Sequence, residues 1–267
     1  LQSLSFTEIS ERLNVNIKSG NQPDLMPYAG RNIIFDDIIA KRNQEDNHYE
    51  DQCTAKYYFD IFNTIKATLG EATRIVEVGV FMGGSTSILA GCAHYLGMEL
   101  DLIDISPNYL QFARERARRC YPDAVESRVR MFHGSLPEYV RDVLKNEDEA
   151  RVIIHHDGSH SFEQVIRDLG SLYYIRNHVH SLLIQDTNLR GMPKYFNFVD
   201  SAVFAIFGRN VTYAPLGTVY QSTGGPNQWE GNYVMPDEPE GMYIPFSHNK
   251  FHYPHPRINL AHFFDKL

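Results

Sequence analysis

The sequence predicts an α/β fold, namely a doubly wound and mainly parallel β-sheet with an antiparallel edge. From about residue 73, short apolar runs typical of buried strands alternate with segments of helical periodicity. Two of the helical segments open with start signals, Ser106-Pro107 and the capping box Ser161-x-x-Gln164. Strands that alternate with helices are joined by right-handed crossovers, which produce a parallel sheet covered on both faces.

The predicted strands are short and rich in Val, Ile and Leu. The parallel ones are expected at residues 74–80, 99–105, 128–132, 151–155 and 181–184. Three later runs, residues 210–215, 218–222 and 231–235, are expected to form the antiparallel edge. Between the early strands, residues 85–96 place Ile88, Leu89, Cys92 and Leu96 on one helical face.

The ends of the chain differ in pattern from its middle. Residues 1–70 read as helices and a polar loop, and we expect an N-terminal helical or lid segment there. Residues 71–235 carry the strand–helix alternation and form the main predicted domain. Residues 236–267 are rich in Pro, His and aromatic side chains with little periodicity, and we expect a C-terminal arm that packs on the same domain.

Composition excludes several classes of protein. The chain has 267 residues and a formal net charge of −8, which argues against a nonspecific nucleic-acid or anionic-membrane surface. No apolar run approaches the length of about 18 residues needed to span a membrane, and the first eight residues do not resemble a signal peptide. Three cysteines without C-x-x-C spacing favour a reducing compartment. We expect a cytoplasmic protein that binds a small molecule and no nucleic acid or membrane, with homo-oligomerisation left open.

A glycine turn follows the first predicted strand, in the run Glu77-x-Gly79-x-x-x-Gly83-Gly84-Ser85. Gly79 and Gly83 would let the backbone approach a ligand closely, and the next helix would offer free N–H groups to an anionic group. The dinucleotide fingerprint requires glycine where Phe81 stands, so a nicotinamide dehydrogenase is disfavoured. The alternative to a ligand-binding turn is a glycine turn that only connects the strand to the helix.

Asp104 ends the second predicted strand, just before a capped helix. In a doubly wound sheet, an acid at this strand tip reaches the ribose hydroxyls of a nucleotide. The alternative is that Asp104 only helps to cap the helix at Ser106-Pro107.

Together, these residues resemble the cofactor motifs of class I S-adenosylmethionine-dependent methyltransferases, over roughly residues 55–235. The resemblance implies a Rossmann-like methyltransferase fold with seven strands, the last of them antiparallel, and S-adenosyl-L-methionine as cofactor. It places Asp104 at the ribose. The other cofactor-binding residues that it implies are Glu77, Gly79, Gly83 and Ser85 near the methionine part, Gly134 and Ser135 near the adenine, and Asp157.

Two later strands end in carboxylates, Asp157 after the fourth and Asp186 after the fifth. The carboxyl ends of neighbouring parallel strands meet in one crevice, so these two side chains are expected to converge. Paired carboxylates resist joint ionisation unless a cation or a proton intervenes. Oxygen ligands of this type suit Mg²⁺, Mn²⁺ or Ca²⁺ better than zinc, so Asp157 and Asp186 are candidate ligands of such a cation.

The run Asp157-Gly158-Ser159-His160-Ser161-Phe162 restricts the resemblance to a smaller group of related families. It is similar to the macrocin and rhamnosyl O-methyltransferases and to the cephalosporin-hydroxylase-like branch, which have Asp-Gly-x-His-x-Tyr at this place. Those families carry Glu/Asp-Asp after the next strand, with the carboxylates binding a divalent metal. The resemblance thus implies a divalent cation, Mg²⁺ first, held by Asp157, Gln185 and Asp186. Gln185 replaces the first acid of the pair, and its amide oxygen can still bind Mg²⁺, although the lost charge should weaken the binding.

The resulting hypothesis is a metal-assisted O-methyltransferase that acts on a hydroxyl of a small natural product or sugar. His160, His156 and Asp157 are the predicted catalytic residues, with His133 as a further candidate base, because imidazole titrates near physiological pH. For each histidine, a structural hydrogen-bonded role is the alternative. Two other functions stay open: a same-fold enzyme with different chemistry or an oxygenase partner, and a noncatalytic binding protein.

Overall fold

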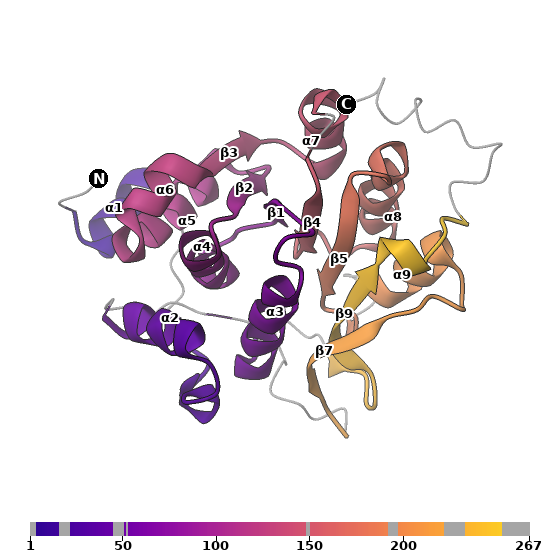
Figure 1. The fold of residues 1–267 in the computed structure, drawn as a ribbon, viewed down its shortest axis with the longest axis horizontal. Coiled ribbons are helices and arrows are strands. Elements are labelled where there is room, and N and C mark those ends of the chain that lie inside the picture. The colour runs from indigo at the N-terminus through magenta and orange to yellow at the C-terminus, as the bar shows by residue number, and fades with distance from the viewer. Residues whose placement is uncertain are drawn as a thin grey trace. The chain divides into compact units, whose positions relative to one another are not determined.

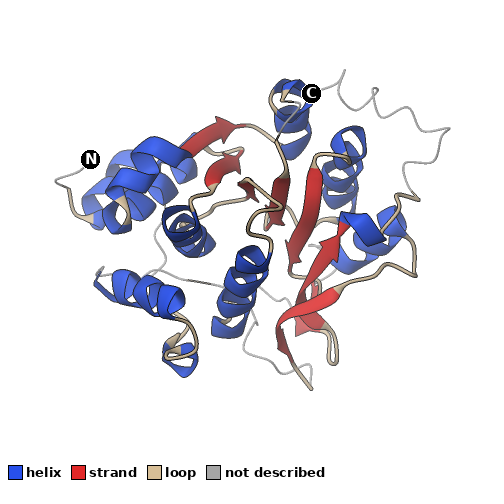
Figure 2. Cartoon of the chain, viewed as in Figure 1, coloured by secondary structure: helices blue, strands red, loops and turns tan. Residues whose placement is uncertain are grey.

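The computed structural model describes residues 4–15, 22–44, 51, 53–147, 150–191, 197–221 and 233–252. The chain divides into two compact units, residues 1–133 and residues 134–267. Figure 1 labels the helices and strands, and Figure 2 separates them by type. Within the described residues, every helix is too short or too polar to cross a lipid bilayer.

The first unit contains three parallel strands in the order β3-β2-β1. Val78 of β1 lies opposite Ile103 of β2, and Ile103 lies opposite Phe132 of β3. These strands confirm the first three apolar runs of the sequence. Their bounds are β1 Arg74–Val78, β2 Glu99–Asp104 and β3 Val129–His133, and the helices between and after them are α4 Gly84–Leu96, α5 Pro107–Cys120 and α6 Pro122–Arg128.

The N-terminal part of this unit is helical. It contains α1 Phe6–Leu13, the short helix η1 Met26–Tyr28, α2 Ile33–Gln44 and α3 Ala55–Ala67. Ser5 opens α1 with a capping box that satisfies otherwise free N–H groups. Ile9 of α1 packs in one apolar cluster with Phe112 of α5 and Met82 of the glycine turn. The N-terminal helix therefore supports the turn, and its role as a lid stays a prediction.

The second unit contains four strands in the order β4-β5-β9-β7. Strand β4 is parallel to β5, β9 runs antiparallel to β5, and β7 is antiparallel to β9. Their bounds are β4 Val152–His156, β5 Val179–Gln185, β7 Ala214–Val219 and β9 Pro239–Pro245, and a separate small sheet pairs β6 Leu189–Arg190 with β8 Tyr233–Val234. The helices are α7 Leu136–Asp142, η2 Leu144–Asn146, α8 Phe162–Ser171, η3 Leu172–Ile175, α9 Val199–Phe207 and η5 Phe246–His248.

The predicted fold class is confirmed, because the seven strands are mainly parallel and the edge pairing is antiparallel. The assignment of the edge strands needs correction. Strand β9 comes from residues that were expected to form an arm without periodicity, and residues 210–222 contribute one strand, β7, with an irregular register between Leu216 and Val219. Proline and glycine weaken the strand signal of β9, so its pairing with β5 decides its structure. Residues 253–267 of the predicted arm lie outside the described residues.

Candidate functional site

The glycine turn of the first unit joins β1 to α4. Gly79 and Gly83 both adopt left-handed backbone conformations, with φ of 83° and 76°. A Cβ at Gly83 would lie 3.1 Å from Ala113 Cα and 3.2 Å from Ala113 Cβ on α5. Glycine is therefore required at Gly83 for two reasons, its φ and its close approach to the next helix.

The carboxylate of Asp104 fastens this turn. The N–H of Val80 donates to Asp104 Oδ2 at 3.0 Å, and the N–H of Ser106 donates to Oδ1 at 2.8 Å. Asp104 thus binds both the turn and the start of α5, which includes the capping role considered as the alternative. The side chain is half-buried, and each oxygen has a further lone pair that could accept a ribose hydroxyl.

Glu77 and Ser85 tie the strand before the turn to the helix after it. Glu77 is fully buried, and the hydroxyl of Ser85 donates to its Oε1 at 2.5 Å. A hydrogen bond to a buried carboxylate is among the stronger ones in proteins. These two residues therefore fix the shape of the turn, whatever contact they make with a ligand.

Phe81 lies in the turn, at the position where the dinucleotide fingerprint requires glycine. Its φ of 41° is uncommon for a residue with a Cβ, and such strain collects at functional sites. Its ring packs on that of Tyr109 with centroids 5.2 Å apart and stays 38% exposed. The turn therefore presents an aromatic surface one residue away from Val80, whose amide binds Asp104.

Helices of the N-terminal segment also reach the turn. Gly84 comes so close to Tyr58 and Asp51 that a Cβ there would lie 2.6 Å from the Tyr58 hydroxyl and 2.7 Å from Asp51 Oδ1. Asp51 accepts a hydrogen bond from Tyr58 and pairs with Arg42, whose Nη2 lies 2.8 Å from Asp51 Oδ2. This buried group was missed because its members are distant in sequence from the motif that they support.

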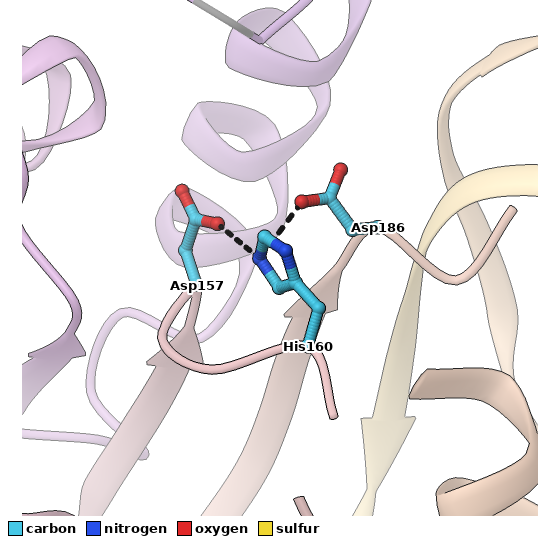
Figure 3. Close-up of side chains that lie close together, drawn as sticks. All are labelled: Asp157, His160 and Asp186. Atoms are coloured by element: carbon cyan, nitrogen blue, oxygen red, sulfur yellow. Dashed lines mark ion pairs between the residues drawn. The ribbon is translucent and has the colours of Figure 1, made fainter. Parts of the chain in front are cut away.

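In the second unit, Asp157, His160 and Asp186 lie together (Figure 3). Asp157 directly follows β4, His160 precedes the N-cap of α8, and Asp186 directly follows β5. His160 Nε2 is 2.9 Å from Asp186 Oδ2 and 3.6 Å from Asp157 Oδ1, and the three ligand atoms all lie within 4.8 Å of one another. The structure thus brings together the two carboxylates that were expected to converge, and adds a histidine between them.

The charges of this cluster control its titration. Burial disfavours the charged imidazole, but the carboxylates of Asp186 and Asp157 outweigh it and raise the pKa of His160 to about 10. Burial, with the nearby negative charge of Asp186, raises the pKa of Asp157 to about 6. The imidazole therefore holds its proton more firmly than a free histidine does, and the role of His160 as a base stays a prediction.

The donor set of the cluster fits a divalent cation. Two carboxylate oxygens supply negative charge and an imidazole nitrogen supplies a neutral ligand once it is deprotonated. His160 Nε2 is buried and has no hydrogen bond of regular geometry among the residues that the structure describes. The cluster of Asp157, His160 and Asp186 therefore has donor atoms that a divalent cation can accept.

His156 lies in a different environment. It is 1% exposed, and its Nε2 is 2.9 Å from Asp168 Oδ2 on α8. Gln164 donates to the other oxygen of Asp168 at 2.8 Å. These contacts favour the structural alternative for His156. His133, the other candidate, belongs to the first unit, where its Nε2 lies 3.0 Å from the Ile105 carbonyl oxygen.

The remaining predicted residues have local partners. The N–H and the hydroxyl of Ser135, which follows Gly134, both donate to Glu138 Oε2 at 2.7 Å and start α7. Gln185 ends β5 opposite Gly241 and is 3% exposed. The adenine contacts of Gly134 and Ser135 and the metal contact of Gln185 stay predictions.

Asn188 is a residue that the sequence analysis missed. It is completely buried, and neither polar atom of its side chain has a hydrogen-bond partner within the described part of the chain. Buried amide groups without partners cost free energy and are rare in native proteins. Asn188 could have been singled out in the sequence because it lies two residues after Asp186, near the end of a predicted strand.

Known proteins support the fold that these elements define. A family model described as a methyltransferase domain matches residues 76–180. A protein assigned as an O-methyltransferase from Klebsiella pneumoniae is similar in structure, with 15% identity, a TM-score of 0.51, and coverage of 82% of this chain and 92% of that chain. No curated protein matches the chain in sequence.

Two further structures are more distant. An O-methyltransferase from Bacillus cereus in complex with S-adenosylhomocysteine has 12% identity and a TM-score of 0.47, over 81% of this chain and 92% of that chain. The human methyltransferase 10 domain containing protein has 10% identity and a TM-score of 0.48, over 80% of this chain and 99% of that chain. The family match is limited to residues 76–180, and the Klebsiella structure shares the fold of the chain: together they show a Rossmann-like methyltransferase fold in which residues 76–180 are similar to a methyltransferase domain.

Proposed function

We propose that the protein is an S-adenosylmethionine-dependent O-methyltransferase that acts on a hydroxyl of a small natural product or sugar with the help of a divalent metal. The observation that carries the proposal is the turn from Gly79 to Gly83, fastened by Asp104 and lying within the segment that matches a methyltransferase domain. A turn with two left-handed glycines leaves the backbone open to close approach by a ligand.

Residues of the first unit have defined parts in this proposal. Asp104 accepts the ribose hydroxyls, and the free N–H groups at the start of α4 face the negatively charged carboxylate of the cofactor. Glu77 and Ser85 keep the turn in shape around the methionine part. Gly134, Ser135 and Asp157 complete the proposed cofactor contacts.

The proposed reaction is a direct methyl transfer. An acceptor oxygen forms a bond to the sulfonium methyl carbon while the carbon–sulfur bond breaks, its electron pair stays on sulfur, and S-adenosylhomocysteine and a proton are released. No covalent enzyme intermediate is required, so positioning supplies much of the acceleration. Asp157 and Asp186 are proposed to hold the metal, with Gln185 as a further candidate, and a bound divalent cation lowers the pKa of a hydroxyl that it contacts.

Two measurements test the proposal. Calorimetry of the full chain with S-adenosylhomocysteine should show binding that Asp104→Ala weakens by more than tenfold, because hydrogen bonds to a charged group contribute about 1.5–3 kcal/mol. Asp123→Ala, an exposed acid on α6, is the matched control and should leave binding unchanged. Absence of binding by the wild type would contradict the proposal and favour a noncatalytic protein.

The second measurement concerns the reaction. Cofactor with an isotopically labelled methyl group is incubated with panels of hydroxylated sugars and phenols, and the products are analysed by mass spectrometry. Label on an acceptor oxygen supports O-methyl transfer. Consumption of the cofactor with the label elsewhere would favour the alternative, a same-fold enzyme with other chemistry.

We also propose a cytoplasmic location for the protein. All three of its cysteines, Cys53, Cys92 and Cys120, are buried thiols. Thiols that persist in this form are typical of a reducing compartment. Fractionation of cells that produce the protein at its native level checks this location.

A further inference from the structure

We infer that His160 is a ligand of the divalent cation, so that the site has one imidazole and two carboxylates and prefers a first-row transition ion such as Mn²⁺, Fe²⁺ or Co²⁺ to Mg²⁺. The inference rests on the proposed function only in that a metal is bound at Asp157 and Asp186. It changes the role of His160 from base to ligand and changes the class of ion.

The spacing of the three ligand atoms carries the inference. Metal–ligand distances of about 2.0–2.3 Å place neighbouring ligand atoms about 3 Å apart and opposite ones about 4.5 Å apart. His160 Nε2 lies 2.9 Å from Asp186 Oδ2 and 3.6 Å from Asp157 Oδ1. All three atoms lie within 4.8 Å of one another. The side chains therefore already stand at distances that one ion can bridge without moving the strands.

The contact of His160 with the carboxylates is not an ordinary hydrogen bond. Histidine–carboxylate pairs normally align the ring N–H with an oxygen, as regular hydrogen bonds require. His160 Nε2 has no such aligned partner in the described part of the chain, although Asp186 Oδ2 is near enough. In the same unit, His156 does make a regular hydrogen bond to Asp168, at the same distance of 2.9 Å. Figure 3 shows the two carboxylates on either side of the His160 ring, each directed toward it.

The backbone holds the cluster in place at a cost. Asp186 has a φ of 60°, a left-handed conformation that is unfavourable for most residues with a Cβ. The following residue is fixed to β9, because the Thr187 N–H donates to the Glu240 carbonyl at 3.1 Å and its hydroxyl to the Pro239 carbonyl at 2.7 Å. Strained backbone that is held by its surroundings is typical of ligand sites.

The loop that carries His160 is also fixed. The N–H of Phe198 donates to the carbonyl of His160 at 3.2 Å, and Ser161 forms a β-bridge with Asn197. The backbone at His160 and Ser161 is therefore held by Asn197 and Phe198. A ligand needs such positioning, because a loose side chain would lose conformational entropy on binding the ion.

The chemistry of the donors selects the ion. Carboxylate and water oxygens suit Mg²⁺, whereas imidazole is a ligand typical of transition ions. Two carboxylates balance the charge of a divalent cation.

The test uses Mn²⁺ and the chain of 267 residues. Pulsed electron paramagnetic resonance detects directly whether a nitrogen is bonded to Mn²⁺, and it needs no methyl acceptor. We expect the wild type to show nitrogen coupling and to bind Mn²⁺ more tightly than Mg²⁺ in calorimetry. His160→Gln should remove the coupling and weaken Mn²⁺ binding at least tenfold, with a smaller effect on Mg²⁺.

The control is His180→Gln, which removes a half-buried histidine from β5 and should leave the nitrogen coupling intact. Wild-type Mn²⁺ without nitrogen coupling, or coupling that persists in His160→Gln, would overturn the inference. So would the absence of Mn²⁺ binding by the wild type. A wild-type spectrum without nitrogen coupling overturns the inference even if the variant fails to fold.

The inference and the proposed function can fail separately. If the wild type binds S-adenosylhomocysteine but shows no coupling, only the role of His160 is wrong. If it shows coupling but binds no S-adenosylhomocysteine, the metal site stands and the methyltransferase proposal falls.

Discussion

The glycine turn of the first unit and the carboxylate cluster of the second are held in opposite ways. In the turn, Asp104 accepts two backbone N–H groups, and Glu77 accepts the hydroxyl of Ser85. In the cluster, two carboxylates and an imidazole stand in contact without a regular hydrogen bond at the ring nitrogen. The polar groups of the turn bind one another, whereas the ring nitrogen of the cluster has no such partner in the described part of the chain, and the proposed cation would supply one.

The largest expected effect concerns the shape of the turn. Gly83→Ala should lower the free energy of unfolding by about 2–4 kcal/mol, because it combines a left-handed φ with overpacking against α5. The control is Gly97→Ala at the other end of α4, where φ is 71° and nothing lies within 4 Å of the added Cβ. It should cost about 1–2 kcal/mol. Equal losses in denaturant unfolding would show that the approach to α5 does not matter.

The next effect tests whether the cluster is completed by a cation. Mn²⁺ at 100 times its dissociation constant should stabilise the wild type by about 2.7 kcal/mol, as mass action requires. Asp186→Asn should abolish this gain, and Asn is the suitable replacement because it tolerates the left-handed φ of 60°. Thermal unfolding with Mn²⁺ and with a chelator measures the gain. An equal gain in the variant would place the ion elsewhere.

A smaller effect is expected at Asp104, where the turn is fastened by charge. Asp104→Asn should lower the free energy of unfolding by about 1.5–2 kcal/mol, because an amide group cannot accept both N–H bonds. Mn²⁺ binding should not change. Chemical denaturation of this variant beside Asp123→Asn gives the comparison. A loss of Mn²⁺ affinity in Asp104→Asn would mean that turn and cluster do not act independently.

Periodicity and the rules of parallel sheets predicted much of the fold. Strands β1, β2, β4 and β5 lie where the apolar runs were, since buried strands carry a strong hydrophobic signal. Strand β9 was missed, because Pro239, Gly241 and Pro245 conceal its strand character and its partner β5 lies far away in sequence.

The candidate site was predictable to the level of strand ends. The rule that parallel strands end at one edge placed Asp157 beside Asp186. The position of His160 depends on the loop that follows β4, so spacing alone could not distinguish a base from a ligand. The sequence also could not predict that Asp104 binds both the turn and the start of α5, because both contacts are made by backbone N–H groups.

A crystal structure of the wild type grown with S-adenosylhomocysteine and Mn²⁺ would show both proposed ligands at once. We expect an anomalous Mn²⁺ peak bonded to Asp157, His160 and Asp186, and S-adenosylhomocysteine bound at Asp104 with the turn from Gly79 to Gly83 unchanged. A manganese peak at other residues, or S-adenosylhomocysteine bound away from Asp104, would contradict this expectation.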